Sequence, residues 1–425
     1  MLSITPIRVA ALVDLARSPH AGGHVKCWER LGQAAAGGGL PLDLTVYFSG
    51  PQAVEDLGPG ARFRSLPPVF STERLNFLPY VPDHSDLAPY HRRLARELSQ
   101  YDVIHTTDAY FAFARTAERV SRKHAIPLVT SFHTDTPSYT RIFTRQTIEH
   151  RFGGNWLART LLDHWDIPER QGRRSERRLR DHVARCDRAL STREDDHELA
   201  VELLGADKVE SLRLGIDKAL FGPHQSDRRG MERRYGIPPD QVVVLFVGRL
   251  DVGKNIHTLI AAMARLRAEG APVHLIAAGL GPAAKDIHRE LGASASVLGY
   301  VGPRELARLY ASVNVLALVS EVEIRSMVGV EAMASGCPVL VSQASGVAPL
   351  FNYTPAMRQV SGGVGAWTDA LRAFCADLPC QDLMRAAALR YSREHLASWR
   401  RVLAEDLLPV WRRAAKCDMR IELAA

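Results

Sequence analysis

The sequence contains little that would mark an exported, membrane-spanning or metal-binding protein. Its six cysteines are scattered, without a CxxC pair or a Cys/His cluster at zinc spacing, which favours a reduced compartment. No apolar run approaches the ~20 residues that a bilayer-spanning helix needs. The N-terminus enters a strand-like run directly and lacks the layout of a signal peptide. We therefore expect a cytoplasmic protein, and peripheral attachment to the inner face of the membrane stays open.

Two nucleotide-related fingerprints are also missing. Neither half contains the G-x-G-x-x-G pattern of dinucleotide-binding folds, which argues against a nicotinamide-dependent oxidoreductase. The net charge of +7 comes without a recognised nucleic-acid-binding motif, so we expect no nucleic acid partner. What remains is an ordered globular chain of 425 residues, 46% hydrophobic and 24% charged, long enough for two domains of roughly 200 residues each.

Strand-like apolar runs alternate with helix-like stretches along the chain, which is typical of parallel sheets with helices on both faces. A polar segment with glycine and proline, 221–230, interrupts this alternation. We therefore predict an α/β fold of two Rossmann-like, doubly wound domains that face a central cleft and span 1–220 and 221–396. A C-terminal amphipathic helix, within 397–425, is expected to pack back on the first domain. Strands are predicted at 7–12, 42–48, 102–107, 127–133, 186–192, 209–214, 242–248, 273–279, 296–301, 313–319 and 338–342.

Two glutamates eight positions apart form the most informative stretch of the sequence. Glu323 follows the apolar run 313–319, and Glu331 opens a small-residue helix that stops at Gly336 and Pro338. Because open α/β sheets bind ligands at their carboxyl edge, both carboxylates can face one crevice there. Carboxylates suit hydroxyl groups, since they accept two or more hydrogen bonds. The alternative is a helix with one exposed and one capping glutamate.

A basic loop leads from the predicted strand 242–248 into a helix at Asn255. Arg249 and Lys254 on this loop can converge on one anion, and the helix N-terminus adds partial positive charge. This arrangement suits a diphosphate. It does not match the phosphate-binding pattern G-x-x-x-x-G-K-[ST], because asparagine follows the lysine. A solvent-facing basic turn is the alternative.

Glycines occur where other predicted strands end. Gly22 and Gly23 follow the first strand, where their backbone N–H groups can meet a phosphate. Gly279 ends a later strand, where it can let the backbone approach a ligand. Tight turns are the alternative, and we favour a turn for Gly281.

His133 ends the predicted strand 127–133. At the carboxyl edge of a sheet, a histidine can hydrogen-bond a substrate hydroxyl or transfer a proton near neutral pH. Asp135, two residues later, is a candidate orienting partner or acceptor-side base. A structural histidine is the alternative, and we favour that interpretation for His105.

The basic excess is concentrated between residues 141 and 185, which include eleven arginines and six acidic residues. A solvated helical face and an anionic membrane surface are open interpretations, whereas the missing binding motif argues against a nucleic acid surface. We expect the segment 139–185 to border an acceptor site and to contact anionic lipid. Its aromatic residues include Phe143, Phe152, Trp156 and Trp165.

Together these stretches resemble the retaining, nucleotide-sugar-dependent glycosyltransferases of family 4. The resemblance covers most of the chain and rests on the order and spacing of the pieces, because each is weak alone. It implies the GT-B fold, with an acceptor-binding N-terminal domain and a nucleotide-sugar-binding C-terminal domain. The pieces are Gly22–Gly23, Asp102–His105, Ser131–His133, Leu214–Asp217 with Phe221, Gly248–Arg249 with Lys254, Gly279–Pro282, Glu323 and Glu331.

The resemblance implies roles for the residues near the nucleotide. Arg249 and Lys254 would hold the donor diphosphate and offset charge on the leaving group. Glu331 would accept hydrogen bonds from the ribose hydroxyls. The backbone N–H of Gly23, beside Gly22, would reach a phosphate.

At the donor sugar, the resemblance places Glu323 and His133, with His133 helping to align the sugar. Family members usually carry a Phe-Gly pair two and three residues after the first glutamate, where this chain has Arg325 and Ser326. Serine keeps that backbone only if its φ is allowed. Arg325 adds a cation, which fits either an anionic donor sugar or a shifted loop. The donor contacts are expected to continue through Met327 and Val328.

The activity implied is that of a metal-independent hexosyltransferase with a front-face mechanism and no bound cofactor. Its donor would be a UDP- or GDP-linked sugar, and its acceptor a glycan, lipid-linked or small-molecule hydroxyl. A catalytically silent relative that binds nucleotide sugars or partner proteins is the alternative. Sugar epimerisation or phosphorolysis on the same fold is a third possibility.

Overall fold

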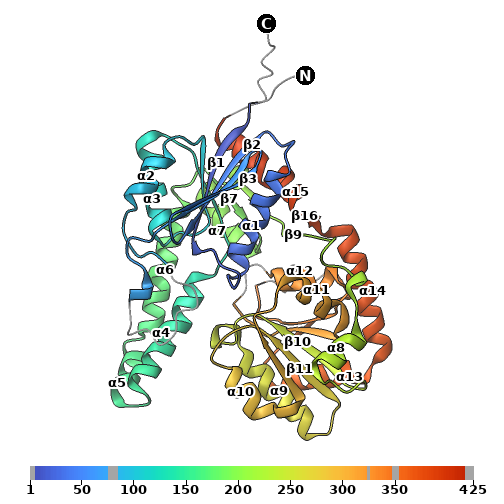
Figure 1. Ribbon diagram of the computed structural model, residues 1–425. Helices are drawn as coiled ribbons and strands as arrows, with labels where there is room; N and C mark the ends of the chain where they lie inside the picture. Colours follow the sequence, from blue (N-terminus) through green and yellow to red (C-terminus); the bar gives the residue numbers. More distant parts are fainter. Residues whose placement is uncertain (1–4, 75–84, 323–325, 347–353, 417–425) are drawn as a thin grey trace. The chain divides into compact units, whose positions relative to one another are not determined.

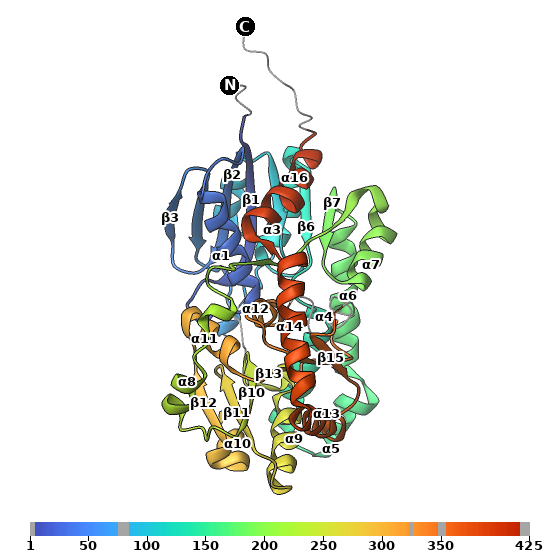
Figure 2. The same ribbon diagram turned by 90° about the vertical axis from the view of Figure 1, so that its right-hand side faces the viewer.

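The computed structural model describes residues 5–74, 85–322, 326–346 and 354–416. The chain divides into two compact units, of which the first comprises residues 1–215 with 399–425 and the second 216–398. Each unit is a twisted sheet covered by helices (Figures 1 and 2). Among the described residues, no helix combines the length and the apolar character needed to cross a bilayer.

The first unit is built on an eight-stranded sheet. Its neighbouring strands are parallel, except for the two strands at one edge, residues 53–58 and 61–66, which are antiparallel to each other. The central strands are apolar and buried, as expected for a parallel sheet covered on both faces. The order is β3 (Ala53–Gly58), β4 (Ala61–Leu66), β2 (Leu42–Ser49), β1 (Ile7–Ala16), β5 (Val103–Thr106), β6 (Leu128–Ser131), β7 (Arg188–Ser191) and β8 (Val209–Ser211).

Helices cover both faces of this sheet. On one face, α1 (Gly23–Ala36) packs on β1, β2 and β4, because its buried residues recur at helical spacing. On the other face, α2 (Arg92–Leu98) and α3 (Ala112–His124) pack against each other, and α3 contacts β1 and β5 (Figure 1). Near the end of the sheet, α7 (Glu194–Leu204) lies against β7 and β8.

A helical hairpin extends from the first unit beyond its sheet (Figure 1). Its two long helices, α4 (Thr136–Phe152) and α6 (Ile167–Val183), pack against each other. Between them lie α5 (Trp156–Arg159) and a π-helical segment, Thr160–His164. A small apolar cluster, centred on Ile148, holds this tip together.

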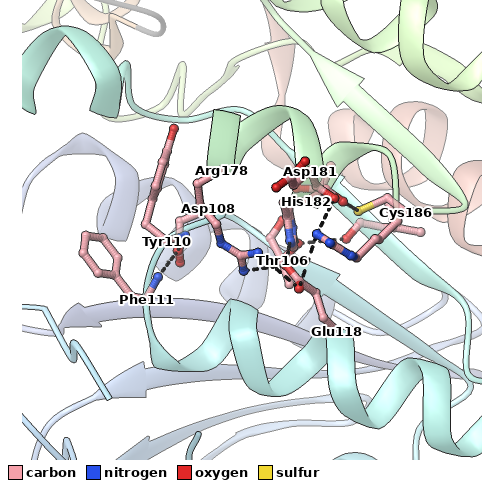
Figure 3. A network of polar contacts seen from close by, with 12 residues as sticks. Thr106, Asp108, Tyr110, Phe111, Glu118, Arg178, Asp181, His182 and Cys186 are labelled. Carbon is pink, nitrogen blue, oxygen red and sulfur yellow. Dashed lines mark hydrogen bonds and ion pairs between the residues drawn. The ribbon is translucent and has the colours of Figure 1, made fainter. Parts of the chain in front are cut away.

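The base of the hairpin is held by a partly buried polar network (Figure 3). Glu118 of α3 lies within 2.6 Å of His182 Nδ1 and accepts a hydrogen bond from Arg178 Nη2 at 2.6 Å. The other ring nitrogen of His182 lies 2.9 Å from the hydroxyl of Thr106. Because these residues come from α3, α6 and β5, the network anchors the hairpin to the sheet.

The second unit contains a six-stranded, fully parallel sheet. Its order is β12 (Ala295–Gly299), β11 (Val273–Ala278), β10 (Val242–Val247), β13 (Val315–Leu318), β14 (Val339–Ser342) and β15 (Met357–Val360). Two groups of helices cover it: α9 (Ile256–Ala268) contacts α10 (Ala284–Leu291) and α13 (Val364–Ala376), whereas α12 (Met327–Ala334) contacts α11 (Pro303–Ser312) and α14 (Leu378–His395). A shorter helix, α8 (Arg228–Tyr235), packs on α11. The predicted α/β fold of two doubly wound parallel sheets is confirmed.

The chain passes between the units twice, at β9 (Gly215–Ile216) and β16 (Ala397–Ser398), which pair with each other. The C-terminal segment of the first unit then forms α15 (Trp399–Val402), a π-helical segment, Leu403–Leu407, and α16 (Leu408–Ala414). The sequence predicts one continuous amphipathic helix here, so the π-helical segment is an unexpected feature. α16 contacts β1 and β6, and its Trp411 is fully buried.

Candidate functional site

The polar motifs of the second unit lie at the carboxyl edge of its sheet. β10 and β13 are neighbours, yet α9 after β10 and α12 after β13 belong to opposite helical layers. Such a reversal makes a topological switch point, the place where open α/β sheets bind ligands. β10 leads into the loop with Arg249 and Lys254, and β13 leads into the stretch that precedes Glu331.

Asp251, which is completely buried, organises the basic loop. Its Oδ2 accepts a hydrogen bond from Arg249 Nε at 2.8 Å, and its Oδ1 accepts one from the backbone N–H of Lys254 at 3.1 Å. A 3-10 turn, Val252–Lys254, follows Asp251 and ends at the second cationic residue. One carboxylate therefore holds the Arg249 side chain and the Lys254 backbone within a single short loop.

Asn255 connects this turn to the end of β13. Its Nδ2 donates to the backbone carbonyl of Val319 at 3.3 Å, and its Oδ1 accepts a hydrogen bond from the Thr258 hydroxyl at 2.8 Å. Its backbone is left-handed, with φ of 53°, a conformation that asparagine tolerates better than most residues. Since Asn255 occupies the N-cap position of α9, its bond to Val319 ties the N-terminus of this helix to the end of the neighbouring strand.

Gly279 and Gly281 lie where the loop after β11 packs against the basic loop. Leu250 N–H donates to the carbonyl of Leu280 at 2.8 Å, and Gly248 N–H to that of Ala278 at 3.0 Å. A Cβ on Gly279 would lie 1.8 Å from the Gly248 carbonyl oxygen, and one on Gly281 2.3 Å from that of Leu250. Close packing of two loops therefore requires both glycines. The predicted contact of Gly279 with a ligand stays a prediction.

Glu331 lies within α12, because this helix begins four residues earlier, at Met327, and not at Glu331 as the sequence pattern predicts. Tyr310 Oη of α11 donates a hydrogen bond to Glu331 Oε2 at 3.3 Å. Burial and the nearby carboxylate raise the pKa of Tyr310 well above its usual value, so the phenol remains a donor. Met327 and Val328, the predicted donor contacts, form the half-buried first turn of α12.

Ser326 caps α12, since its hydroxyl accepts a hydrogen bond from Gly329 N–H at 3.1 Å. Its φ of −106° belongs to ordinary extended backbone, so serine fits here without strain. Glu323 and Arg325 lie outside the residues that the structure describes. Their predicted contacts with the donor sugar stay predictions.

In the first unit, His133 lies just beyond β6 and close to the start of α1. Its ring stacks on that of His24 at 4.5 Å between centroids, and its Nε2 accepts a hydrogen bond from Trp28 Nε1 at 3.3 Å. The N-cap of α1 is Gly22 and its first residue is Gly23, and its first turn contains no acidic side chain. A helix N-terminus of this kind favours an anion.

His105 and Asp135 make contacts that explain them structurally. His105 is fully buried, its Nδ1 accepts a hydrogen bond from Trp411 Nε1 at 2.9 Å, and burial lowers its pKa to about 3. The carboxylate of Asp135 caps α4 by accepting from Ser138 N–H at 3.1 Å, and it pairs with Arg193 at 3.1 Å. The predicted role of Asp135 in orienting His133 stays a prediction.

Two hollows in the described part of the chain lie away from these motifs. One, of about 700 Å³, is lined in the first unit by Pro127, Asp187 and Ala414. The other, of about 500 Å³, is lined in the second unit by Gln241 and Asn314. Both lie at the amino ends of strands, opposite the motif loops. Within the described ranges, no group of three or more His, Cys, Asp or Glu side chains is arranged to hold a metal ion.

Family comparisons cover both units. Residues 21–220 match the model of "Glycosyltransferase Family 4", and residues 227–353 match that of "Glycosyl transferases group 1". The chain belongs to glycosyltransferase family 4. The matched residues include Gly22, His133, Arg249, Lys254 and Glu331.

Among curated proteins, the family 4 chain is similar to D-inositol 3-phosphate glycosyltransferase of Mycobacterium tuberculosis (strain ATCC 25618 / H37Rv), with 32% identity over 249 residues. This alignment covers 52% of the chain and 50% of the relative, so the chain spans about half the length of the curated relatives it matches.

Solved structures resemble almost the whole family 4 chain. Sucrose-phosphate synthase from Thermosynechococcus elongatus superposes with a TM-score of 0.68 and 19% identity, covering 97% of this chain and 100% of that one. HepE from Anabaena, in complex with UDP and glucose, superposes with a TM-score of 0.64 and 16% identity, covering 97% and 99%. These likenesses show that the fold is GT-B.

The sequence did not single out three residues that position the motifs of this family 4 chain. Asp251 and Asn255 flank Lys254, and a signal for both existed, because Asp and Asn are favoured at turns and helix starts. Tyr310, which contacts Glu331, comes from the preceding helix. No local pattern in the sequence connects those two residues.

Proposed function

We propose that the chain is a retaining glycosyltransferase that moves a hexosyl group from a UDP- or GDP-linked sugar to an acceptor hydroxyl. The acceptor is a glycan, a lipid-linked saccharide or a small molecule. The observation that carries this proposal is the switch point of the second unit, where Asp251 holds the Arg249 side chain and the Lys254 backbone on one loop. Asn255 ties that turn to the end of β13, and α12 with Glu331 follows.

Arg249 and Lys254 bind the donor diphosphate in this proposal, together with the N-terminus of α9. When the bond from the anomeric carbon to the diphosphate breaks, its electron pair stays on the leaving phosphate oxygen. Fixed cations at that oxygen stabilise the developing charge, and such preorganised groups commonly contribute about 3 kcal/mol each. The cations and the helix end thus act where other enzymes use a metal, so we propose neither a metal ion nor a cofactor.

The acceptor oxygen forms its bond to the anomeric carbon on the face that the diphosphate leaves. Its proton passes to the leaving phosphate oxygen, which balances the reaction without an enzymatic nucleophile. The configuration at the anomeric carbon is retained.

The remaining roles are those that the resemblance to the family implies. Glu331, oriented by Tyr310, accepts hydrogen bonds from the ribose hydroxyls. Glu323 and His133 contact the donor sugar, and the N–H groups at Gly22 and Gly23 meet a phosphate. A ligand of similar chemistry accompanies HepE, whose structure is in complex with UDP and glucose.

We also propose that the hairpin borders the acceptor site and brings the protein to the inner face of an anionic membrane. Trp156 and Trp165 at its tip are 71% and 48% exposed. Exposed tryptophans next to arginines suit the lipid interface, where the ring enters the headgroup region and the cation meets anionic lipid. The protein would then be cytoplasmic and peripheral to the membrane.

Calorimetric titration of the full chain with UDP and with GDP tests the nucleotide site. We expect one of the two to bind, and Arg249→Ala and Lys254→Ala each to weaken binding about tenfold or more, because each removes a charge-assisted contact. Exposed residues of α9 and α10 supply matched controls, Arg265→Ala and Lys285→Ala, which should bind like the wild type. Unchanged affinity in both site variants would refute the assignment.

A donor-hydrolysis assay over a panel of nucleotide sugars separates an enzyme from a silent binding protein. Slow hydrolysis of one donor is the expected result. If the nucleotide binds and no donor is hydrolysed, the catalytically silent alternative replaces this proposal.

A further inference from the structure

A continuous chain of hydrogen bonds connects the C-terminal helix of the first unit with His133. Trp411 Nε1 bonds to His105 Nδ1 at 2.9 Å, and His105 Nε2 lies 2.7 Å from the hydroxyl of Ser131. That hydroxyl lies 2.8 Å from His133 Nε2, which is also 3.3 Å from Trp28 Nε1. All five residues belong to the first unit, and their side chains are buried.

The direction of each bond at His105 follows from the donors that surround it. An indole N–H only donates, so His105 Nδ1 must accept from Trp411. The ring is fully buried, and burial lowers its pKa to about 3, so it is neutral near pH 7. Its single proton therefore lies on Nε2 and is donated to the oxygen of Ser131.

The same argument then fixes the ring of His133. Since Ser131 accepts from His105, its own hydroxyl proton is directed at the remaining partner, His133 Nε2. Trp28 Nε1 points a second N–H at the same nitrogen. With two donors, Nε2 carries a lone pair and no proton, because a proton there would face both donors.

We propose that Trp28, Ser131, His105 and Trp411 are positioning residues that hold His133 as a neutral imidazole with its proton on Nδ1. His133 then donates from Nδ1 to an oxygen of the bound ligand, and it does not serve as an acceptor through Nε2. The C-terminal helix contributes to this arrangement through Trp411, although it is distant from His133 in sequence. The inference rests on the proposed function only for the identity of the ligand oxygen, which is a hydroxyl of the donor sugar.

Nitrogen-15 NMR of the full chain with labelled histidine tests the tautomer without any ligand. The two ring nitrogens of a neutral histidine differ widely in shift, so the protonated one is identified directly. The chain contains sixteen histidines, and the His133 signals are those that disappear in His133→Gln. We expect Nδ1 of His133 to carry the proton in the wild type at pH 7.

Removing the two donors to His133 Nε2, Trp28 and Ser131, should allow the ring proton to move from Nδ1 to Nε2. In the double variant Trp28→Phe with Ser131→Ala, we expect signals of the Nε2-protonated tautomer of His133 to appear and to dominate. Each single variant should produce a partial shift in the same direction. Ser296→Ala is the matched control, because Ser296 bonds to another buried histidine, His274, in the second unit. That control should leave the His133 signals unchanged.

An Nε2-protonated or doubly protonated His133 in the wild type would overturn the proposal, and so would a double variant with unchanged signals. These outcomes do not depend on nucleotide binding. The NMR result can therefore support the tautomer even if neither UDP nor GDP binds in the titrations. A failure of this inference and a failure of the proposed function are thus distinguishable.

Discussion

Arg249 donates a hydrogen bond from Nε to Oδ2 of Asp251 at 2.8 Å, and this carboxylate is completely buried. A buried carboxylate is tolerated only when charged or polar donors satisfy it. Asp251 meets this requirement with the two cationic residues of the loop, through the Arg249 side chain and the Lys254 backbone. The geometry of the proposed diphosphate site therefore depends on a residue that need not touch the diphosphate.

We predict that Asp251→Asn weakens UDP or GDP binding about as much as Arg249→Ala does. The amide keeps the shape but loses the charge that holds the guanidinium, so Arg249 leaves its position. The free energy of unfolding should fall by about 1–3 kcal/mol, the usual loss for a buried charge-assisted hydrogen bond. Calorimetric titration and denaturant melts measure the two effects. Asp286→Asn, at a partly exposed ion pair with Arg289, is the control and should change neither. Wild-type affinity in Asp251→Asn would contradict the prediction.

Glu331 and Tyr310 should act on the ribose and not on the phosphates. We predict that Glu331→Gln weakens UDP binding about tenfold, because a carboxylate that accepts from hydroxyls becomes an amide that accepts less strongly. Tyr310→Phe should weaken it less, since it removes only the hydrogen bond that orients the carboxylate. Inorganic diphosphate is the diagnostic ligand. Its affinity should fall in Lys254→Ala and stay unchanged in Glu331→Gln; an equal loss of both ligands in Glu331→Gln would place this residue at the phosphates.

The fold and the site differ in how far the sequence predicts them. The buried parallel strands were predictable, because runs such as Val242–Val247 are continuous and apolar. The β3–β4 hairpin was not, because β3 is an exposed, polar edge strand without an apolar run. Arg249 and Lys254 could be assigned from one loop, which is a local pattern. The contacts of Glu331 with Tyr310 could not, since they depend on how two helices pack.

The network at the base of the hairpin should make stability depend on acidity. Burial alone would raise the pKa of Glu118, but the hydrogen bonds and charges of His182 and Arg178 outweigh it and hold this pKa below its usual value of 4.5. Glu118 thus stabilises the folded state fully above about pH 4.5, and this contribution disappears as the pH falls through its lower folded pKa. We expect the melting temperature of the wild type to fall steeply over that acidic interval.

Glu118→Gln tests this assignment. It should cost about 2 kcal/mol of unfolding free energy near pH 7, because it leaves Arg178 without its partly buried charge partner and His182 Nδ1 without a carboxylate acceptor. The difference from the wild type should shrink as the pH falls below 4. The control is Glu202→Gln, which removes an exposed ion pair with Arg180, a residue of α6 like Arg178 and His182. This variant should melt like the wild type at every pH. A constant difference between Glu118→Gln and wild type across the pH range would show that the charge is not responsible.

The hairpin tip should bind anionic membranes through its two exposed tryptophans. We expect the full chain to float with vesicles that contain phosphatidylglycerol at low salt, to float less at high salt because ions screen the arginines, and not to float with neutral vesicles. The double variant Trp156→Ala with Trp165→Ala should lower the apparent affinity for these vesicles at least tenfold, because burying each ring at the interface contributes about 1.5 kcal/mol or more. The matched control removes two exposed leucines of α14, with Leu378→Ala and Leu383→Ala, which are 65% and 70% exposed in the wild type. If that control and the tryptophan variant lose binding equally, general surface hydrophobicity is responsible. If the wild type shows no salt-sensitive binding to anionic vesicles, the hairpin is a solvated face and the proposed membrane contact is wrong. The proposed nucleotide site does not depend on that result.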